Sequence, residues 1–307
     1  MGRYTARRLL QMLPVFIGTT FLIFALVFAI PGDPIRALAG DRPISPSTVA
    51  TLREEYNLDD PLVVQYGKYM AGLVQGDFGK DYNGREVVDI MAHRFPVTIR
   101  LALVAFIFEI LIGLVAGVVA ALRRRSYLDT LVLVTTTAIV SIPTFVLGFT
   151  LQLLLGVKLG WFPIAGISQG WYSYLLPGFV LGALSLAYVA RLTRTSLVEN
   201  LRADYVRTAT SKGLSRKRVV GRHALRNSLI PVVTYLGIDL GALMGGAIVT
   251  EGIFNLPGIG QQVFLSVRAQ EGPVVVGIVT ALVLVFIFAN LAVDLLYGVL
   301  DPRIRYE

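Results

Sequence analysis

The chain of 307 residues has no cysteine, two histidines and few charged residues. The lack of cysteine excludes disulfide frameworks, thiolate metal sites and cysteine nucleophiles. Two histidines, His93 and His223, are too few for a histidine-rich metal centre, so we expect no metal site. Charged residues make up 16% of the chain, against about 25% in a typical soluble domain. Hydrophobic residues make up 55%, and the mean hydropathy is +0.68. This composition argues against a soluble enzyme.

Six apolar stretches are each long enough to cross a bilayer, which takes roughly 20 residues. They are residues 9–30, 99–122, 130–156, 175–192, 228–250 and 273–298. We therefore predict an all-α membrane protein with six transmembrane helices. The first stretch is longer than the apolar part of a typical signal peptide, so we interpret it as a retained helix.

Basic residues are distributed unevenly between the predicted loops. With the N-terminus in the cytoplasm, 18 of the 28 basic residues lie inside, whereas the two short outer loops carry one each, Lys158 and Arg268. Six spans then place both termini in the cytoplasm. Ten basic and two acidic residues lie between Arg191 and Arg226, and the rest of the chain holds 18 of each sign. One predicted inner segment therefore carries the whole net charge of +8.

The remaining long segment, residues 31–98, is predicted to lie outside. Val49–Tyr56 and Val63–Val74 can form short amphipathic helices. Periodicity alone does not decide between a small ordered cap and a flexible loop; the fold that we predict has a structured segment here. We divide the chain into residues 1–98, the first helix (9–30) with this outer segment (31–98), and residues 99–307, a five-helix core. The core includes an inner loop at 193–227.

The inner segment has a helical pattern of its own. Leu197, Leu201, Tyr205 and Ala209 recur every four residues, which predicts an amphipathic helix. Gly213 follows where a helix C-terminus favours a residue with positive φ. Ser215 can then cap a second short helix, whose apolar side is Val219, Val220, His223 and Ala224. A loop that binds lipid head groups needs only positive charge and no pair of helices with an apolar face of its own. The pattern therefore favours the interpretation that this segment docks a protein.

The same segment resembles the "EAA" loop of ABC-importer permeases. That loop has Glu-Ala-Ala, three residues, Gly, nine residues and Ile-x-Leu-Pro. Here Arg207-Thr208-Ala209 takes the place of Glu-Ala-Ala, Gly213 that of the glycine, and His223-Ala224-Leu225-Arg226 that of the last element. Arg for Glu, His for Ile and Arg for Pro are departures that look like the dipeptide/oligopeptide branch.

Further motifs along the chain are similar to that branch, and the long outer segment suggests its B-type subunit. They are Pro31-Gly32-Asp33-Pro34, Gln65-Tyr66, Gly76-Asp77-Phe78-Gly79, Ser141-Ile142-Pro143-Thr144-Phe145, Leu159-Gly160-Trp161-Phe162-Pro163, residues 251–260 and residues 300–305.

The resemblance implies a type I ABC-importer permease fold with a cytoplasmic coupling-helix loop in a bacterial inner membrane. It implies a second permease subunit as heterodimer partner, two cytoplasmic ATPases and an extracytoplasmic peptide-binding protein. ATP and Mg would be bound by the ATPases, with no cofactor and no catalytic residue in this chain, and no nucleic-acid partner is expected. The residues expected to couple to the ATPases are Asp204, Arg207, Thr208, Ala209, Lys212, Gly213 and Leu214.

Two carboxyl groups lie within predicted spans. Glu109 is midway along the second span and Asp239 midway along the fifth. A carboxylate at the bilayer centre costs roughly 2.5–3.5 kcal/mol on insertion scales, so it usually faces a cavity or a partner. Both are candidates for the translocation pathway. A carboxyl bonded to a neighbouring helix is the alternative. Asp239 is the stronger candidate because it lies within a Gly-x-x-x-Gly stripe that begins at Gly237 and lets another backbone approach.

The loop from Glu251 to Gly260 is the last candidate site. It either turns between two helices or dips into the outer mouth as a gate, and the resemblance favours the gate. The candidate gate residues are Glu251, Phe254, Pro257 and Gly258.

Several functions compete with peptide import. The same importer class also carries nickel, glutathione or haem. An intramembrane protease would need catalytic geometry beyond the two acids, and neither Gly-x-Ser-x-Gly nor His-Glu-x-x-His occurs. A self-contained channel or secondary transporter would work without partners. No phosphate-binding Gly-x-x-x-x-Gly-Lys-Ser/Thr loop is present, so ATP chemistry has to come from another chain.

Overall fold

The computed structural model describes residues 2–28, 45–55 and 57–300. Across these residues the fold is helical, and the one β-type contact is an isolated bridge between Lys80 and Glu86. The long helices are α1 (Gly2–Phe28), α5 (Val87–Phe108), α6 (Leu114–Leu122), α7 (Tyr127–Ser141), α9 (Leu175–Asn200), α12 (Leu225–Ile253) and α14 (Gly272–Leu300). The shorter ones are α3 (Pro46–Glu55), α4 (Leu62–Val74), α8 (Thr144–Leu151), α10 (Asp204–Ser211), α11 (Arg216–Arg218) and α13 (Ile259–Arg268).

Three π-helical segments and one 3-10 turn complete the chain. They are η1 (Glu109–Gly113), η2 (Gln152–Lys158), η4 (Val219–Ala224) and the 3-10 turn η3 (Gly170–Tyr174). Since η1 joins α5 to α6 without a break, the second predicted span is one helix of 36 residues, 87–122. It begins twelve residues before the predicted start. Asp89, His93 and Arg94 interrupt the apolar run there, but they do not interrupt the helix.

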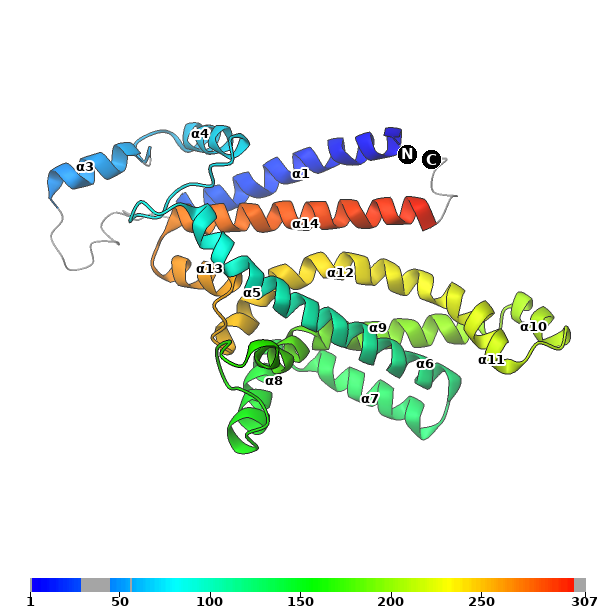
Figure 1. Cartoon of the computed structure of the whole chain (residues 1–307). Coiled ribbons are helices and arrows are strands. Elements are labelled where there is room, and N and C mark those ends of the chain that lie inside the picture. The colour runs from blue at the N-terminus through cyan, green and yellow to red at the C-terminus, as the bar shows by residue number, and fades with distance from the viewer. Residues whose placement is uncertain (1, 29–44, 56, 301–307) are drawn as a thin grey trace.

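Helix α9 is the centre of the bundle and is packed by α5, α6, α7 and α12 (Figure 1). Small residues let the backbones approach. On α9, a Cβ at Gly182 would lie 2.8 Å from the carbonyl oxygen of Ala105. On α6, a Cβ at Gly117 would lie 2.6 Å from the carbonyl oxygen of Ala190. The close packing of α9 against α5 and α6 therefore requires glycine at both positions.

The third predicted span is not one straight helix. Residues 127–141 and 144–158 form two helical pieces bent by 105°. Ile142 has an extended backbone (φ −96°, ψ 124°), because the ring of Pro143 disfavours helical geometry in the residue before it. The expectation of a continuous helix over 130–156 was wrong in this respect. The other five predicted stretches fall within long helices, apart from residues 29–30, which lie outside the described part of the chain.

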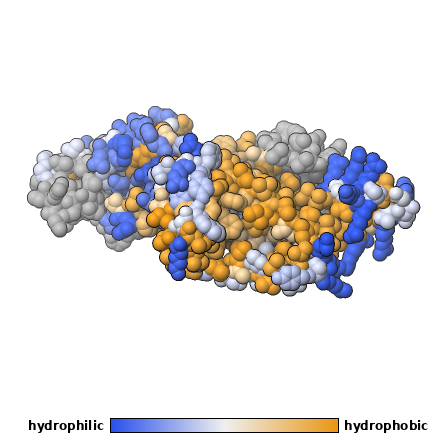
Figure 2. Space-filling view, turned by 60° about the horizontal axis from the view of Figure 1, so that its bottom comes forward, coloured by the Kyte–Doolittle hydropathy of each residue, from blue (hydrophilic) through white to orange (hydrophobic). Residues whose placement is uncertain are grey.

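The two ends of the bundle differ in what they carry. At one end lie α10 and α11, the start of α1 and the end of α14; at the other lie α3, α4 and α13 (Figure 1). We call these the α10 end and the α13 end. Figure 2 shows a hydrophobic belt between hydrophilic ends on the face that it displays. The predicted helices in the outer segment are present as α3 and α4. The motif Pro31–Pro34 and residues 301–305 lie outside the described residues.

Candidate functional site

The α10 end carries a helix pair that we call the bracket, residues 204–224. On α10, Asp204, Arg207 and Thr208 are exposed, as is Lys212 just beyond its end. On the opposite side of the helix, Val206 and Ala209 are buried. Arg207 and Asp204 form an ion pair of 3.5 Å that is almost fully exposed, so it contributes little to stability. Helix α10 therefore offers a polar, charged face and uses its other face for packing.

A glycine turn ends α10. Gly213 has φ +76°, as predicted. The N–H of Gly213 donates to the carbonyl of Thr210 at 2.9 Å, and the N–H of Leu214 donates to that of Ala209 at 3.3 Å. These two bonds form a Schellman motif, which satisfies carbonyls that the helix end would leave unpaired. Leu214 packs against the same apolar cluster as Ala209. The turn thus fixes the direction in which the chain leaves α10.

The bracket is seated on the ends of two long helices. Its buried apolar side contacts Ala121 at the end of α6 and Leu197 near the end of α9. The other buried members of this cluster are Val206, Ala209, Val219 and Ala224. The bracket is therefore packed directly against the ends of α6 and α9.

Two details of the predicted bracket were wrong. The four-residue spacing from Leu197 to Ala209 is divided between two helices, because α9 ends at Asn200 and Ala203 is extended before α10. The second helix is not separate either: α11 and η4 run without a break into α12. Ser215 precedes α11 but makes no side-chain cap. The bracket is therefore continuous with a membrane helix on the α12 side.

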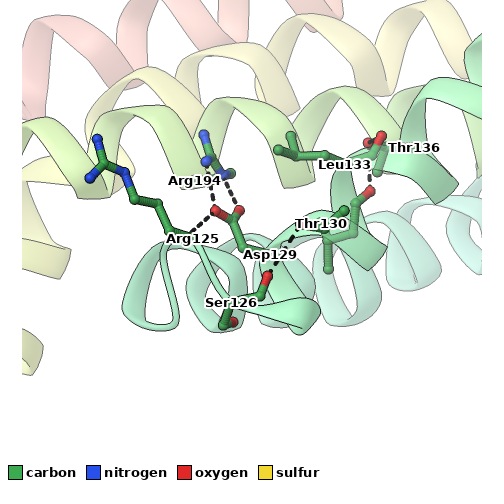
Figure 3. A network of polar contacts seen from close by, with 8 residues as sticks. Arg125, Ser126, Asp129, Thr130, Leu133, Thr136 and Arg194 are labelled. Atoms are coloured by element: carbon green, nitrogen blue, oxygen red, sulfur yellow. Dashed lines mark hydrogen bonds and ion pairs between the residues drawn. The ribbon is translucent and has the colours of Figure 1, made fainter.

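An ion pair near the α10 end holds α7 against α9 (Figure 3). Arg194 donates from Nε to Asp129 Oδ1 at 2.5 Å and from Nη2 to Oδ2 at 2.9 Å. The backbone N–H of Arg125 donates to the same carboxylate at 2.8 Å. Asp129 is 4% exposed, so its charge depends on these donors. Sequence reasoning missed this pair, because 65 residues separate the partners and no spacing rule connects them.

The structure brings Glu109 and Asp239 together. Glu109 lies on η1 and Asp239 on α12, and the two carboxyl groups are close enough to influence each other electrostatically. Glu109 is fully buried, and neither of its carboxyl oxygens has a hydrogen-bond partner among the described residues. Asp239 is 9% exposed and accepts bonds from Ser185 Oγ at 3.0 Å and Tyr235 Oη at 3.3 Å. Asp239 therefore links α12 to α9 inside the bundle, and Glu109 lies beside it on η1. The π-helical turn that carries Glu109 is a feature often found at functional sites.

The glycine stripe of α12 faces away from this pair. A Cβ at Gly237 or Gly241 would meet Val293 or Phe286 of α14 at 2.6 Å and 3.1 Å, whereas nothing lies within 4 Å of Gly245. Residues two positions apart lie on nearly opposite sides of a helix, so Asp239 points to α9 while the stripe points to α14. The stripe is a packing surface for α14.

The loop after α12 is held by a buried polar network. Thr98 on α5 donates to Glu251 Oε1 at 2.6 Å and accepts from the N–H of Ile259 at 2.9 Å. Glu251 Oε2 accepts the N–H of Gln261 at 2.9 Å, so its carboxylate lies at the N-terminus of α13. That end of a helix attracts negative charge. Phe254 is 1% exposed.

Further contacts anchor the same loop. Arg94 donates to the carbonyl of Gly258 at 3.4 Å and to Gln261 Oε1 at 3.3 Å. Pro257 is partly buried, and Gly258 is buried. The four residues considered for a gate therefore lie in or around an anchored turn. Thr98 and Arg94 are part of this site although no sequence motif pointed to them.

Comparison with known proteins agrees with this arrangement of long apolar helices. Residues 113–306 match the family of binding-protein-dependent transport system inner membrane components, and residues 1–102 match the corresponding N-terminal family. The di/tripeptide transport system permease protein DppB of Pseudomonas aeruginosa (strain UCBPP-PA14) is 40% identical over 335 aligned residues, covering both chains completely. The glutathione transport system permease protein GsiC of Escherichia coli (strain K12) is 39% identical over 308 residues, again with complete coverage.

The fold and the bracket thus define a membrane permease of the type I ABC-importer class. The chain belongs to the family of binding-protein-dependent transport system inner membrane components, and it is a permease subunit of an ABC importer in the inner membrane. The resemblance noted in the sequence is confirmed over the full length.

Proposed function

We propose that this permease carries short peptides. The observation that supports this most strongly is full-length similarity, at about the same identity, to a di/tripeptide permease and to glutathione permeases. Glutathione is itself a peptide of three residues, so the two named substrates share amide groups and a free carboxylate. Nickel has neither feature, and haem has propionate carboxylates but no peptide amide; both remain the alternatives within the importer class.

In this proposal the bracket docks a cytoplasmic ATPase. Asp204, Arg207, Thr208 and Lys212 supply the exposed face, and the Gly213 turn with Leu214 and Ala209 holds that face rigid. Rigidity matters because a plug that bends cannot pass ATPase closure to α6 and α9. ATP and Mg are bound by two partner ATPases, and this chain needs no cofactor. The exposed basic residues act at the rim, so their effect falls as salt rises.

The remaining subunits follow from the same proposal. A second permease subunit completes the pathway, and an extracytoplasmic binding protein delivers the peptide at the α13 end. Both termini and the bracket then lie in the cytoplasm. The buried network around Glu251, Phe254, Pro257 and Gly258 is the fixed base of the outer loop, and the buried carboxyl groups of Glu109 and Asp239 lie beside the pathway.

Transport by the complete importer tests the proposal. The chain would be co-expressed with the permease, ATPases and binding protein encoded beside it and reconstituted in proteoliposomes. We expect ATP-dependent uptake of a labelled dipeptide, tripeptide or glutathione, and none when the binding protein is omitted. Uptake of nickel or haem without peptide uptake would contradict the substrate class. Uptake by this chain alone would contradict the importer mechanism.

A further inference from the structure

The central helix α9 is exposed along one narrow stripe. Leu184 and Tyr188 are 51% and 53% exposed, and Arg191, Thr195 and Glu199 continue the exposed positions towards the α10 end. The spacings of four, three, four and four residues place these side chains on one face. Tyr188 lies near the middle of this helix of 26 residues, which runs from Leu175 to Asn200. The stripe therefore reaches membrane depth.

The chemistry of this stripe differs from that of a surface facing lipid. On the helix of residues 87–122, the exposed positions from residue 103 onward are all aliphatic: Leu103, Ile107, Leu111, Ile112, Val115 and Val119. On α9, four of the five exposed residues carry polar groups, and no ion pair of Arg191 occurs among the described residues. Polar and charged groups inside membrane segments generally face a cavity or a partner.

An aromatic pair widens the stripe towards α12. The rings of Tyr188 and Tyr235 are stacked, with centroids 4.5 Å apart and an angle of 29° between their planes. Tyr235 also donates a hydrogen bond to Asp239, which accepts another from Ser185 on α9. The exposed Tyr188 therefore stacks on a tyrosine that is itself fixed by buried hydrogen bonds. Such support keeps a binding surface in one geometry.

We propose that this α9 face, Leu184, Tyr188, Arg191 and Thr195 with Tyr235, is the surface of this chain that contacts the transported peptide. The inference rests on the proposed peptide-importer function and adds the location of the contact. Tyrosine combines an aromatic face for side chains with a hydroxyl for backbone amides. The guanidinium of Arg191, one turn further along, complements the carboxylate that every free peptide carries. The charge and the aromatic pair together select a peptide as the occupant.

The absence of cysteine from the chain makes a direct test possible. In the complete importer, single variants Tyr188→Cys and Thr195→Cys would be treated with a charged, water-soluble methanethiosulfonate reagent during ATP turnover. Leu111→Cys and Val115→Cys on the aliphatic face are matched controls. We expect labelling at positions 188 and 195, none at 111 and 115, and several-fold slower labelling at 188 when peptide and binding protein are present.

Transport kinetics provide a second readout. We expect Tyr188→Ala to raise the KM for peptide uptake several-fold with ATPase stimulation retained, and Tyr188→Phe to have a smaller effect. Two results would overturn the inference in an importer that transports peptide: cysteines at 188 and 195 that stay unreactive or cross-link to the second permease subunit, or equal labelling on the aliphatic face. Failure of wild-type peptide uptake, by contrast, would remove the proposed function itself.

Discussion

The carboxylate of Glu251 lies against the backbone of Gly258 so closely that a Cβ at position 258 would fall 2.3 Å from Glu251 Oε1. The same carboxylate accepts hydrogen bonds from Thr98 and from the N-terminus of α13. Any side chain at position 258 therefore has to displace the group that joins α5, α12 and α13. Glycine is needed here for close approach, since its φ of −96° is open to every residue.

Gly258→Ala tests this contact. Overpacking a buried site typically costs about 1–3 kcal/mol, so we expect a lower melting temperature of the purified importer and reduced transport. Gly252→Ala is the matched control, because nothing lies within 4 Å of its Cβ position in the same loop region. Alanine in a helix is favoured over glycine by about 1 kcal/mol, so the control should be neutral or slightly stabilising. Equal losses in both variants would contradict the role given to Glu251.

The pair of Asp129 and Arg194 gives a second prediction. Removing one partner of a buried ion pair leaves an uncompensated charge, at a cost of about 3–5 kcal/mol. Arg194 is 21% exposed, so we expect Asp129→Ala to lie at the lower end of this range. Thermal unfolding of the detergent-solubilised complex would measure the loss.

Asp204→Ala is the control for that measurement. Asp204 pairs with Arg207 at the surface, where both side chains are exposed, so its loss should change stability by less than about 1 kcal/mol. Similar melting temperatures for Asp129→Ala and wild type would show that the α7–α9 link is not needed for stability.

Much of this fold is predictable because the bilayer sets a length that apolar runs must match. The Gly213 turn is also predictable, because a glycine directly after a helical pattern commonly adopts a positive φ and ends the helix. The break between α9 and α10 is different. No glycine or proline marks residues 197–209, and the helix ends there because Leu197 and Ala209 pack into the same cluster, which a straight helix would prevent.

Contacts between helices across the bundle could not be predicted from the sequence either, because they depend on packing between residues far apart in the chain. The sequence places Glu109 and Asp239 at similar depth, but their contact depends on how α9 orients its two neighbours. The tight contacts of Gly182 and Gly117 that set this orientation involve partners 77 and 73 residues away. The exposure of Tyr188 on a helix that is buried on its other sides has the same origin. Helix packing, which no local pattern contains, therefore determines the interior site and the proposed peptide surface.

Sidedness of the membrane gives a third prediction. Ser211 on α10 and Ser47 on α3 are exposed at opposite ends of the bundle. Because the wild-type chain has no thiol, a membrane-impermeant maleimide should react with Ser47→Cys in intact spheroplasts and with Ser211→Cys only after the membrane is opened. The uneven distribution of arginine is the physical reason. Labelling of position 211 in intact spheroplasts would reverse the orientation and remove the bracket from the cytoplasm.

A substitution at Gly213 tests backbone strain without a steric clash. Nothing lies within 4 Å of a Cβ at position 213, but its φ of +76° is unfavourable for residues with a side chain, by roughly 1–2 kcal/mol. Typical coupling energies between sites are of similar size, about 1–3 kcal/mol. We therefore expect Gly213→Val to leave membrane insertion and binding-protein docking intact, but to lower transport sharply and weaken ATPase attachment or stimulation.

Two further variants show whether the positive φ is the cause. Gly221 also has free space around its Cβ position but an ordinary φ, so Gly221→Ala should transport like wild type. Asparagine adopts the left-handed conformation more readily than other residues, so Gly213→Asn should retain most activity. Uptake of peptide and co-purification of the ATPases would be measured for all three. If Gly213→Val transports at the wild-type rate, the turn is not needed for coupling. If Gly213→Asn fails as completely as Gly213→Val, the side chain itself, and not the backbone conformation, disturbs the docking surface.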